Sequence, residues 1–254
     1  MQTVRIFFSA SNQVPATIVE KDGPVLDVDL TPMRRHYHRL GGPHVKKLEE
    51  FMLYWEEEGY SLLAPRARIA SIDADAVKEV LPPMALEDLG EFDALILSVW
   101  TLGDALERES SRIMARKGSM MKGIFLDVAG SIALYDIHNL LLDWLAKEPA
   151  YGSKHVVGEF YPGFEGDPHP LMQRIEELAE TPRWLNVETH ASPMFHPRKT
   201  QCAFVLLHEE KRAFRRRLLP CHPCEGRRCL YYQLGGCHLG IIKGSGDAFP
   251  FEEE

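Results

Sequence analysis

The sequence predicts an α/β or α+β core with some parallel strand pairing, and three observations support this fold class. Segments with strand and helix patterns alternate between residues 68 and 145. Hydrophobic residues make up 45% of the 254 residues, which is enough to bury one good-sized core, or one core with a small appendage. The sequence contains neither an internal repeat nor a low-complexity linker, so we expect no repeat architecture.

The first third of the chain is expected to supply a hairpin, a helix and a strand. Residues 4–28 contain short β-prone pieces separated by turn residues, which is typical of a hairpin or meander. Pro43 begins an amphipathic helix that Gly59 ends. A strand follows at 68–72, and Asp73 is expected to cap a short helix.

The middle of the chain continues the alternation. Residues 93–100 form an apolar run typical of a fully buried strand, and a helix is expected at 104–117. A second buried strand is expected at 123–127. The helix predicted at 131–145 carries an apolar stripe that includes Leu134, Ile137 and Leu141.

Beyond Pro149 the amino-acid composition changes, because Pro and Gly become frequent from 158 to 170. A short helix is expected at 171–178, and two strands, 185–191 and 201–208, are expected to flank a loop. From Lys211 the chain is basic and then rich in cysteine. We expect an N-terminal α/β portion at 1–90, a core at 91–210 and a basic, Cys-rich, metal-binding tail at 211–254.

The charge balance and the apolar runs limit the class of protein. Twenty-nine Lys and Arg against 37 Asp and Glu give a net charge of −8, so we expect no nucleic-acid partner. The longest apolar run, 94–100, has the length of a strand, so no membrane crossing is expected. Because the N-terminus lacks the layout of a secretory signal, we expect a cytoplasmic protein with reduced thiols.

Four of the five cysteines lie within 17 residues and are expected to bind one metal centre: Cys221, Cys224, Cys229 and Cys237. Thiolates are soft ligands suited to Zn²⁺ or to an iron–sulfur cluster. Their unequal spacing, without a second Cys-x-x-Cys pair, suits a [4Fe–4S] cluster at least as well as zinc. His222 and His238 are alternative ligands. Cys202 lies in an apolar run and is expected to be a small core residue.

Two loops are candidates for ligand binding. In the segment from Glu159 to Asp167, Pro162 and Gly163 hold a turn open beside an aromatic ring. In the segment from Ala191 to Thr200, His196, Arg198 and Lys199 are suited to contact an anionic group. Each pattern by itself is also typical of a packed surface loop.

Several short segments, taken in order, carry a resemblance to a known family. They are Thr101-Leu102-Gly103 after a buried strand, Asp127 to Ser131 in the pattern Asp-x-x-Gly-Ser, Phe160 to Gly166, Met194 to Thr200, and Cys221-x-x-Cys224 followed by Cys229-Leu-Tyr-Tyr232. They resemble the activation domain of vitamin B12 (cobalamin)-dependent methionine synthase, and in particular its short stand-alone bacterial members. The resemblance spans roughly residues 93–232, and the first 90 residues match only loosely.

This resemblance implies an α+β fold, with a mixed curved sheet flanked by helices and a small Cys-rich metal-binding segment. It also implies that the domain lets an oxidised cob(II)alamin be reduced and remethylated by S-adenosylmethionine. The cofactor-binding positions implied are Glu159, Tyr161, Pro162, Gly163, Phe164, Met194 and Lys199. Two of them depart from the family, which has Arg at the position of Glu159 and Tyr at that of Phe164. Because Glu repels the carboxylate that an Arg would pair with, we expect S-adenosylmethionine to bind weakly or not at all.

The expected function is that of an accessory protein in a corrinoid methyltransferase system, which docks on a corrinoid protein and assists its reductive reactivation. An iron–sulfur cluster at the cysteines would pass single electrons, and the basic stretch 211–228 would dock an acidic donor such as a flavodoxin. The alternative is a non-catalytic binding module with a structural zinc and a degenerate nucleotide pocket. A third reading is a methyltransferase that acts directly on a small thiol.

Overall fold

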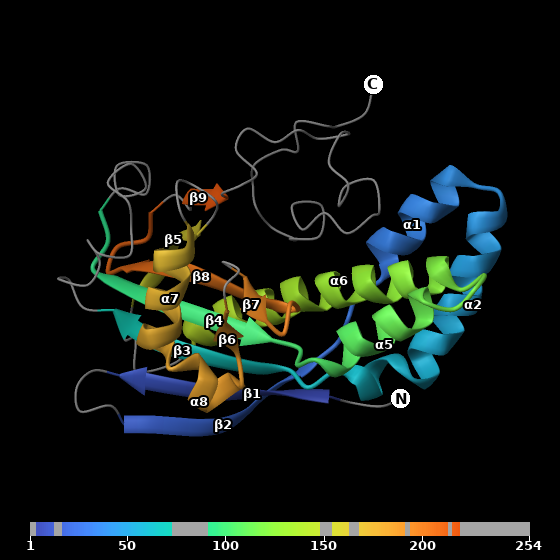
Figure 1. Ribbon diagram of the computed structural model, residues 1–254. Helices are drawn as coiled ribbons and strands as arrows, with labels where there is room; N and C mark the ends of the chain where they lie inside the picture. The colour runs from blue at the N-terminus through green and yellow to red at the C-terminus, as the bar shows by residue number, and fades with distance from the viewer. Residues whose placement is uncertain are drawn as a thin grey trace.

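A mixed sheet of seven strands forms the centre of the part of the chain that the computed structural model describes, which is residues 4–12, 17–72, 91–147, 154–162, 168–190, 194–212 and 215–218 (Figure 1). In spatial order the strands are β2 (Thr17–Leu26), β1 (Val4–Asn12), β3 (Arg66–Ile72), β4 (Ala94–Thr101), β8 (Thr200–His208), β5 (His155–Tyr161) and β9 (Arg215–Leu218). The β1–β3 and β5–β9 pairs are parallel, and the other neighbours are antiparallel. The predicted mixture of helices and sheet with some parallel pairing is therefore confirmed.

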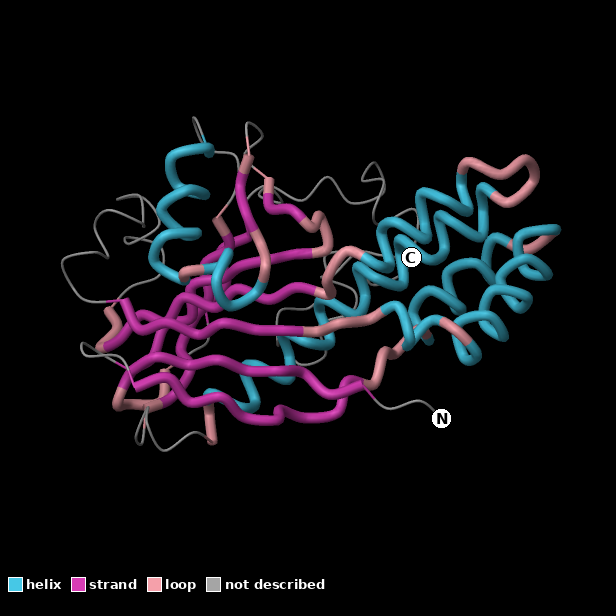
Figure 2. Tube along the Cα trace, turned by 60° about the horizontal axis from the view of Figure 1, so that its bottom comes forward, coloured by secondary structure: helices cyan, strands magenta, loops and turns pink. Residues whose placement is uncertain are grey.

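Helices cover both faces of this sheet and extend beyond its end. Figure 1 shows α7 (Pro168–Ala179) and α8 (Thr181–Leu185) in front of the sheet and α6 (Met120–Leu145) behind it. The remaining helices gather beyond the strand ends, as the tube trace also shows (Figure 2): α1 (Thr31–Leu40), α2 (Pro43–Glu57), the short 3-10 helix η1 (Gly59–Leu62) and α5 (Ala105–Met114). A two-stranded ribbon, β6 (Glu188–Thr189) with β7 (Phe195–His196), lies between α8 and β8 in the sequence.

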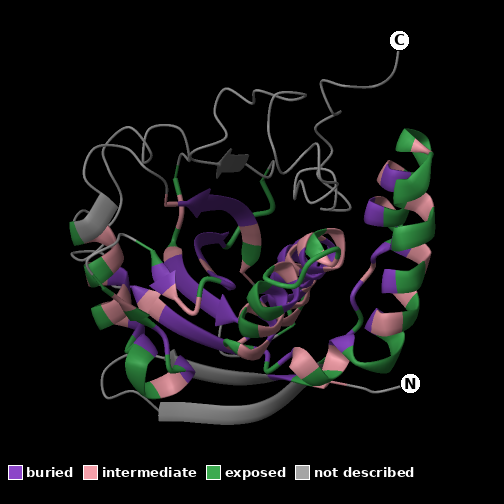
Figure 3. Ribbon diagram, turned by 45° about the vertical axis from the view of Figure 1, so that its right-hand side comes forward, coloured by how far each residue is buried: buried purple, intermediate pink, exposed green. Residues whose placement is uncertain are grey.

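Alternation along the strands gives the sheet two hydrophobic cores. On β4, Ile96 and Trp100 belong to the core that includes α6, whereas Leu97 and Val99 belong to the core that includes Ile175 of α7. Because successive side chains of a strand point to opposite faces, a strand buried on both sides reads as one continuous apolar run. The buried strand predicted at 93–100 and the strand predicted at 201–208 are confirmed in this way. In Figure 3 the buried residues of α1 and α2 face the rest of the protein and the exposed ones face away from it.

The largest difference from the sequence-based expectation is α6. The strand predicted at 123–127 is wrong, because residues 120–145 form one continuous helix. A short apolar run cannot be told from a buried helix by periodicity alone. The Asp-x-x-Gly-Ser pattern accordingly lies inside this helix, where Ser131 Oγ donates to the Asp127 carbonyl one helical turn earlier, at 3.2 Å.

As a single helix, α6 is also long and apolar enough to cross a membrane, the only such helix in the described ranges. However, 72% of its most apolar window is buried inside the protein. Burial of this extent is typical of a core helix.

Other elements differ at the ends of the sheet. Residues 155–161 form β5, although the segment from 158 onward was expected to be a Pro- and Gly-rich loop. The strand predicted at 185–191 is largely wrong, because Leu185 ends α8 and, among the described residues of this range, Glu188–Thr189 alone is a strand. Helix α1 was not predicted. The helix expected after Asp73 lies outside the described residues.

Gly123 allows α5 and α6 to pack closely. A Cβ atom at this position would lie 2.9 Å from the Ser110 carbonyl oxygen and 2.3 Å from Met114 Cγ. The contact is held by Ser110 Oγ, which donates to the Gly123 carbonyl at 2.9 Å. The close crossing of the two helices therefore requires glycine at position 123.

Gly123→Ala is expected to lower the free energy of unfolding by about 1–2 kcal/mol, because overpacking against a backbone carbonyl outweighs the gain of about 1 kcal/mol in helix propensity. Urea denaturation measures the change. Gly130→Ala is the matched control, since its Cβ would first meet Leu106 Cδ2 at 2.7 Å, which is the end of a flexible side chain. Equal stability of the two variants would contradict the close crossing at Gly123.

Candidate functional site

A row of polar residues runs along α6 on the side that faces the sheet: Asp127, Ser131, Tyr135 and His138. These positions are four, four and three residues apart, so they lie on one face of the helix. The residues that contact them come from the ends of β5 and β8 and the loop before β8: Glu159, Lys199 and Gln201. The row is thus a polar seam between the core helix and the sheet, and we call these seven residues the α6 seam.

Lys199 is the centre of the first half of the α6 seam. The residue is only 7% exposed, and its Nζ lies 2.9 Å from Ser131 Oγ and 3.0 Å from Asp127 Oδ1. Since a buried ammonium requires both a counter-charge and hydrogen-bond acceptors, this pairing explains how the side chain is tolerated in the core.

The backbone of Lys199 joins the same group to the end of β4. Its carbonyl accepts from the Leu102 N–H at 2.9 Å and from Thr101 Oγ1 at 3.2 Å. Thr200 Oγ1 donates to Thr101 Oγ1 at 2.8 Å, and the Gly103 N–H donates to the same oxygen at 3.1 Å. The strand end at 101–103, the helix residues 127–131 and Lys199 therefore form one connected hydrogen-bonded group.

Burial lowers the pKa of Lys199 below its ordinary value of 10.5, and the charge of Asp127 opposes that shift. Between the lowered pKa and 10.5 the folded amine binds fewer protons than the unfolded one, so this group makes the free energy of unfolding rise as the pH rises. We expect wild type to gain stability relative to Lys199→Met across this interval, measured by urea denaturation at several alkaline pH values. A constant difference between the two proteins, or one that moves in the opposite direction, would contradict this assignment.

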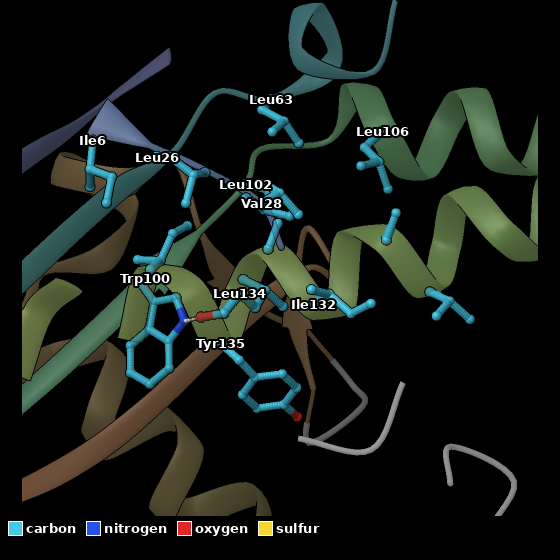
Figure 4. Close-up of a cluster of buried hydrophobic side chains, with 14 of the residues drawn as sticks. Ile6, Leu26, Val28, Leu63, Trp100, Leu102, Leu106, Ile132, Leu134 and Tyr135 are labelled. Atoms are coloured by element: carbon cyan, nitrogen blue, oxygen red, sulfur yellow. Dashed lines mark hydrogen bonds between the residues drawn. The ribbon is translucent and has the colours of Figure 1, made fainter. Parts of the chain in front are cut away.

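His138 and Glu159 form the second half of the α6 seam. Both side chains are 0% exposed, and His138 Nε2 lies 3.0 Å from Glu159 Oε1. The His138 ring also stacks on Trp100, with centroids 4.8 Å apart, and Trp100 Nε1 donates to the Leu134 carbonyl at 2.8 Å (Figure 4). The Glu159 carboxylate is therefore bound inside the protein, against α6.

The structure brings some of the predicted cofactor-binding residues together and separates others. Glu159 and Tyr161 both contact His138, since the Tyr161 ring lies edge-on to it at 5.5 Å. Lys199 lies in the other half of the same seam. Pro162 is half-buried where β5 ends, and Met194 is 43% exposed. Gly163 and Phe164 lie outside the described residues.

The predicted metal ligands Cys221, Cys224, Cys229 and Cys237 also lie outside the described residues. Cys202 does not: it is a buried free thiol on β8, as expected, and burial raises its pKa to about 12. A thiol of that pKa is almost entirely protonated at neutral pH and therefore neither nucleophilic nor suited to bind a metal.

Sequence reasoning missed three members of the α6 seam: Tyr135, His138 and Gln201. Gln201 Nε2 donates to the Tyr135 hydroxyl at 3.1 Å. A signal for the helix members exists in the sequence, because the polar residues at 127, 131, 135 and 138 are spaced to share one face of a helix. Because a strand was expected at 123–127, the helical periodicity was not followed from residue 127 onward.

No family model matches the chain, and no curated protein matches it either. The fold and the α6 seam define the class, an α+β protein with a buried polar contact between its core helix and its sheet. A more specific assignment depends on the residues that carry the family resemblance.

Proposed function

We propose that the chain is an accessory protein of a corrinoid methyltransferase system, related to the activation domain of cobalamin-dependent methionine synthase, and that it assists the reductive reactivation of a corrinoid protein. The observation that carries the proposal is the contact between the motif segments. Thr101-Leu102-Gly103, the segment from Asp127 to Ser131, and Lys199 meet in one hydrogen-bonded group.

This contact supports the resemblance because the segments are far apart in the sequence. Lys199 is 68 residues from Ser131, and its carbonyl lies 98 residues from Thr101. Short motifs that match a family by chance have no reason to meet in space. The segment that begins at Glu159 also contacts α6, through the hydrogen bond between Glu159 and His138.

The placement of Glu159 supports a role in which the chain acts on its partner protein without using S-adenosylmethionine. A ligand carboxylate at this position would have to displace a fully buried side chain from His138. In the proposal, the methyl donor is therefore bound elsewhere, and this chain docks on the corrinoid protein. Electrons would come through the Cys-rich tail from an acidic donor such as a flavodoxin.

The burial of Glu159 against His138 also favours a second candidate, a non-catalytic binding module with a structural zinc and a degenerate nucleotide pocket. The two candidates differ in what the cysteines hold. Protein purified without oxygen is expected to be brown and to contain iron if it passes electrons. Colourless protein that contains zinc would favour the second candidate.

The association experiment uses a purified corrinoid-binding protein loaded with cob(II)alamin. We expect micromolar binding by calorimetry, and a change in the cob(II)alamin absorption spectrum when this chain is added. Arg215, Arg216 and Arg217 replaced together by Ser should weaken binding of the reduced flavodoxin and flatten its salt dependence. The proposal would be contradicted if this chain bound none of the cob(II)alamin-loaded proteins of several methyltransferase systems and changed none of their absorption spectra.

A further inference from the structure

A pocket of about 490 Å³ lies apart from His138 and Glu159, between the start of β3, the start of α5 and the β6–β7 ribbon. Its charged and titratable lining residues are Arg66, Asp104, Glu107, Glu188, His190 and His196. None of these six residues belongs to the α6 seam. The pocket therefore calls for its own explanation.

The β6–β7 ribbon presents three potential metal ligands on one face. Glu188 is paired directly with His196, and Thr189 with Phe195. Directly paired residues point to the same side of a ribbon, so Glu188 points to the side of His196. His190 follows the end of β6, and its ring lies beside that of His196. The opposite side is used for packing, since Phe195 is buried and Thr189 Oγ1 donates to Glu176 at 2.6 Å.

The two imidazole rings have the separation that a shared metal ion requires. The His190 and His196 ring centroids lie 5.0 Å apart, with the ring planes inclined by 33°. Two imidazoles that each bind a tetrahedral zinc through one nitrogen, at about 2.0–2.1 Å, place their centroids roughly 5 Å apart. The separation of the two rings is therefore compatible with their binding one ion.

A third ligand has to move. As the side chains stand, no three His, Cys, Asp or Glu residues in the described ranges are placed to hold one ion. Glu107 is already held by the Arg198 N–H at 2.8 Å, whereas Glu188 is exposed, so its side chain can rotate without disturbing the core. Asp104 is paired with Arg108, so of the three carboxylates in the pocket Glu188 is the one that can complete the set.

We propose that His190 and His196 bind one divalent transition-metal ion of the zinc type, with Glu188 as third ligand and the fourth position open to the pocket. Nitrogen and oxygen ligands of this kind suit Zn²⁺ and its substitute Co²⁺. A water molecule or a small anionic ligand would occupy the open position. None of the three proposed ligands belongs to the α6 seam or to the cysteine cluster.

The test is to measure metal binding by the full chain, using Zn²⁺ in equilibrium dialysis with elemental analysis. His190→Ala and His196→Ala are each expected to remove one equivalent of Zn²⁺, or to weaken its binding by at least about 100-fold, and Glu188→Gln by about 10-fold. His155→Ala is the matched control, because His155 is an exposed histidine at the start of β5 and lies outside the pocket. It should bind as much metal as wild type.

Cobalt separates this site from the cysteines. Thiolate-bound Co²⁺ absorbs strongly in the near ultraviolet, so that band should remain in the histidine variants while one equivalent of Co²⁺ is lost. The proposal is overturned if the double variant His190→Ala/His196→Ala, shown to be folded by circular dichroism, binds as much Zn²⁺ and Co²⁺ as wild type.

Discussion

Replacing His138 by leucine is expected to lower the free energy of unfolding by about 3–5 kcal/mol, because it removes a hydrogen-bond partner of a fully buried carboxylate. Both His138 and Glu159 are 0% exposed and lie 3.0 Å apart, so water does not replace the lost hydrogen bond. The stacking of His138 on Trp100 is lost as well. Urea denaturation followed by Trp fluorescence and by circular dichroism measures the change.

The exposed pair His38–Glu49 supplies the matched control. Its atoms lie 2.8 Å apart, but the side chains are 46% and 39% exposed. His38→Leu is therefore expected to cost less than about 1 kcal/mol. The double variant His138→Leu/Glu159→Leu should recover much of the stability lost in His138→Leu, since an apolar pair can replace a buried polar one. A double variant as unstable as the sum of its single changes would show that the two residues are not coupled.

Wild-type protein is expected to show no micromolar binding of S-adenosylmethionine in titration calorimetry. The family places an Arg where this chain has Glu159, and loss of that charge-assisted pair together with the gain of a like charge costs about 2–5 kcal/mol, or roughly 30- to several-thousand-fold in affinity. The structure adds a second reason, because the Glu159 carboxylate is bound to His138 inside the core.

The wild type alone decides this prediction. Glu159→Arg would insert a guanidinium beside His138 at a site with no solvent exposure, so this variant is expected to be destabilised. Its affinity is informative only where circular dichroism shows a native fold. Saturable micromolar binding by the wild type would show that Glu159 does not occupy the position of the family Arg, or that the ligand does not approach it.

Local patterns in the sequence were enough to predict the strands that are buried on both faces and the helix that is buried along one side. The apolar runs at 93–100 and 201–208 are strands buried on both faces, and the helix from Pro43 to Glu57 buries Leu48, Phe51 and Trp55 on one side. In each case the periodicity of apolar residues reports directly which side is covered. Cys202 was placed correctly in the core for the same reason.

The sequence patterns failed where a segment is covered on every side or is held by residues far away. Gly123 to Asp127 is largely apolar because this part of α6 packs against α5 and against Tyr37 of α1 and Phe51 of α2, so its composition is equally compatible with a strand. Glu159 lies close to Pro162 and Gly163, which are typical of a loop, yet its pairing with Val205 of β8 makes it part of a strand.

From the sequence alone come the fold class, the main strands and the motif residues, because these depend on local periodicity and residue type. The tertiary structure decides which residues meet: Lys199 with Asp127 and Ser131, and Glu159 with His138. Such contacts are set by the register of the sheet and the crossing of α6, both of which involve residues far apart in the chain. Since a charged side chain becomes buried only where a distant partner compensates it, local sequence carries no direct record of these pairs.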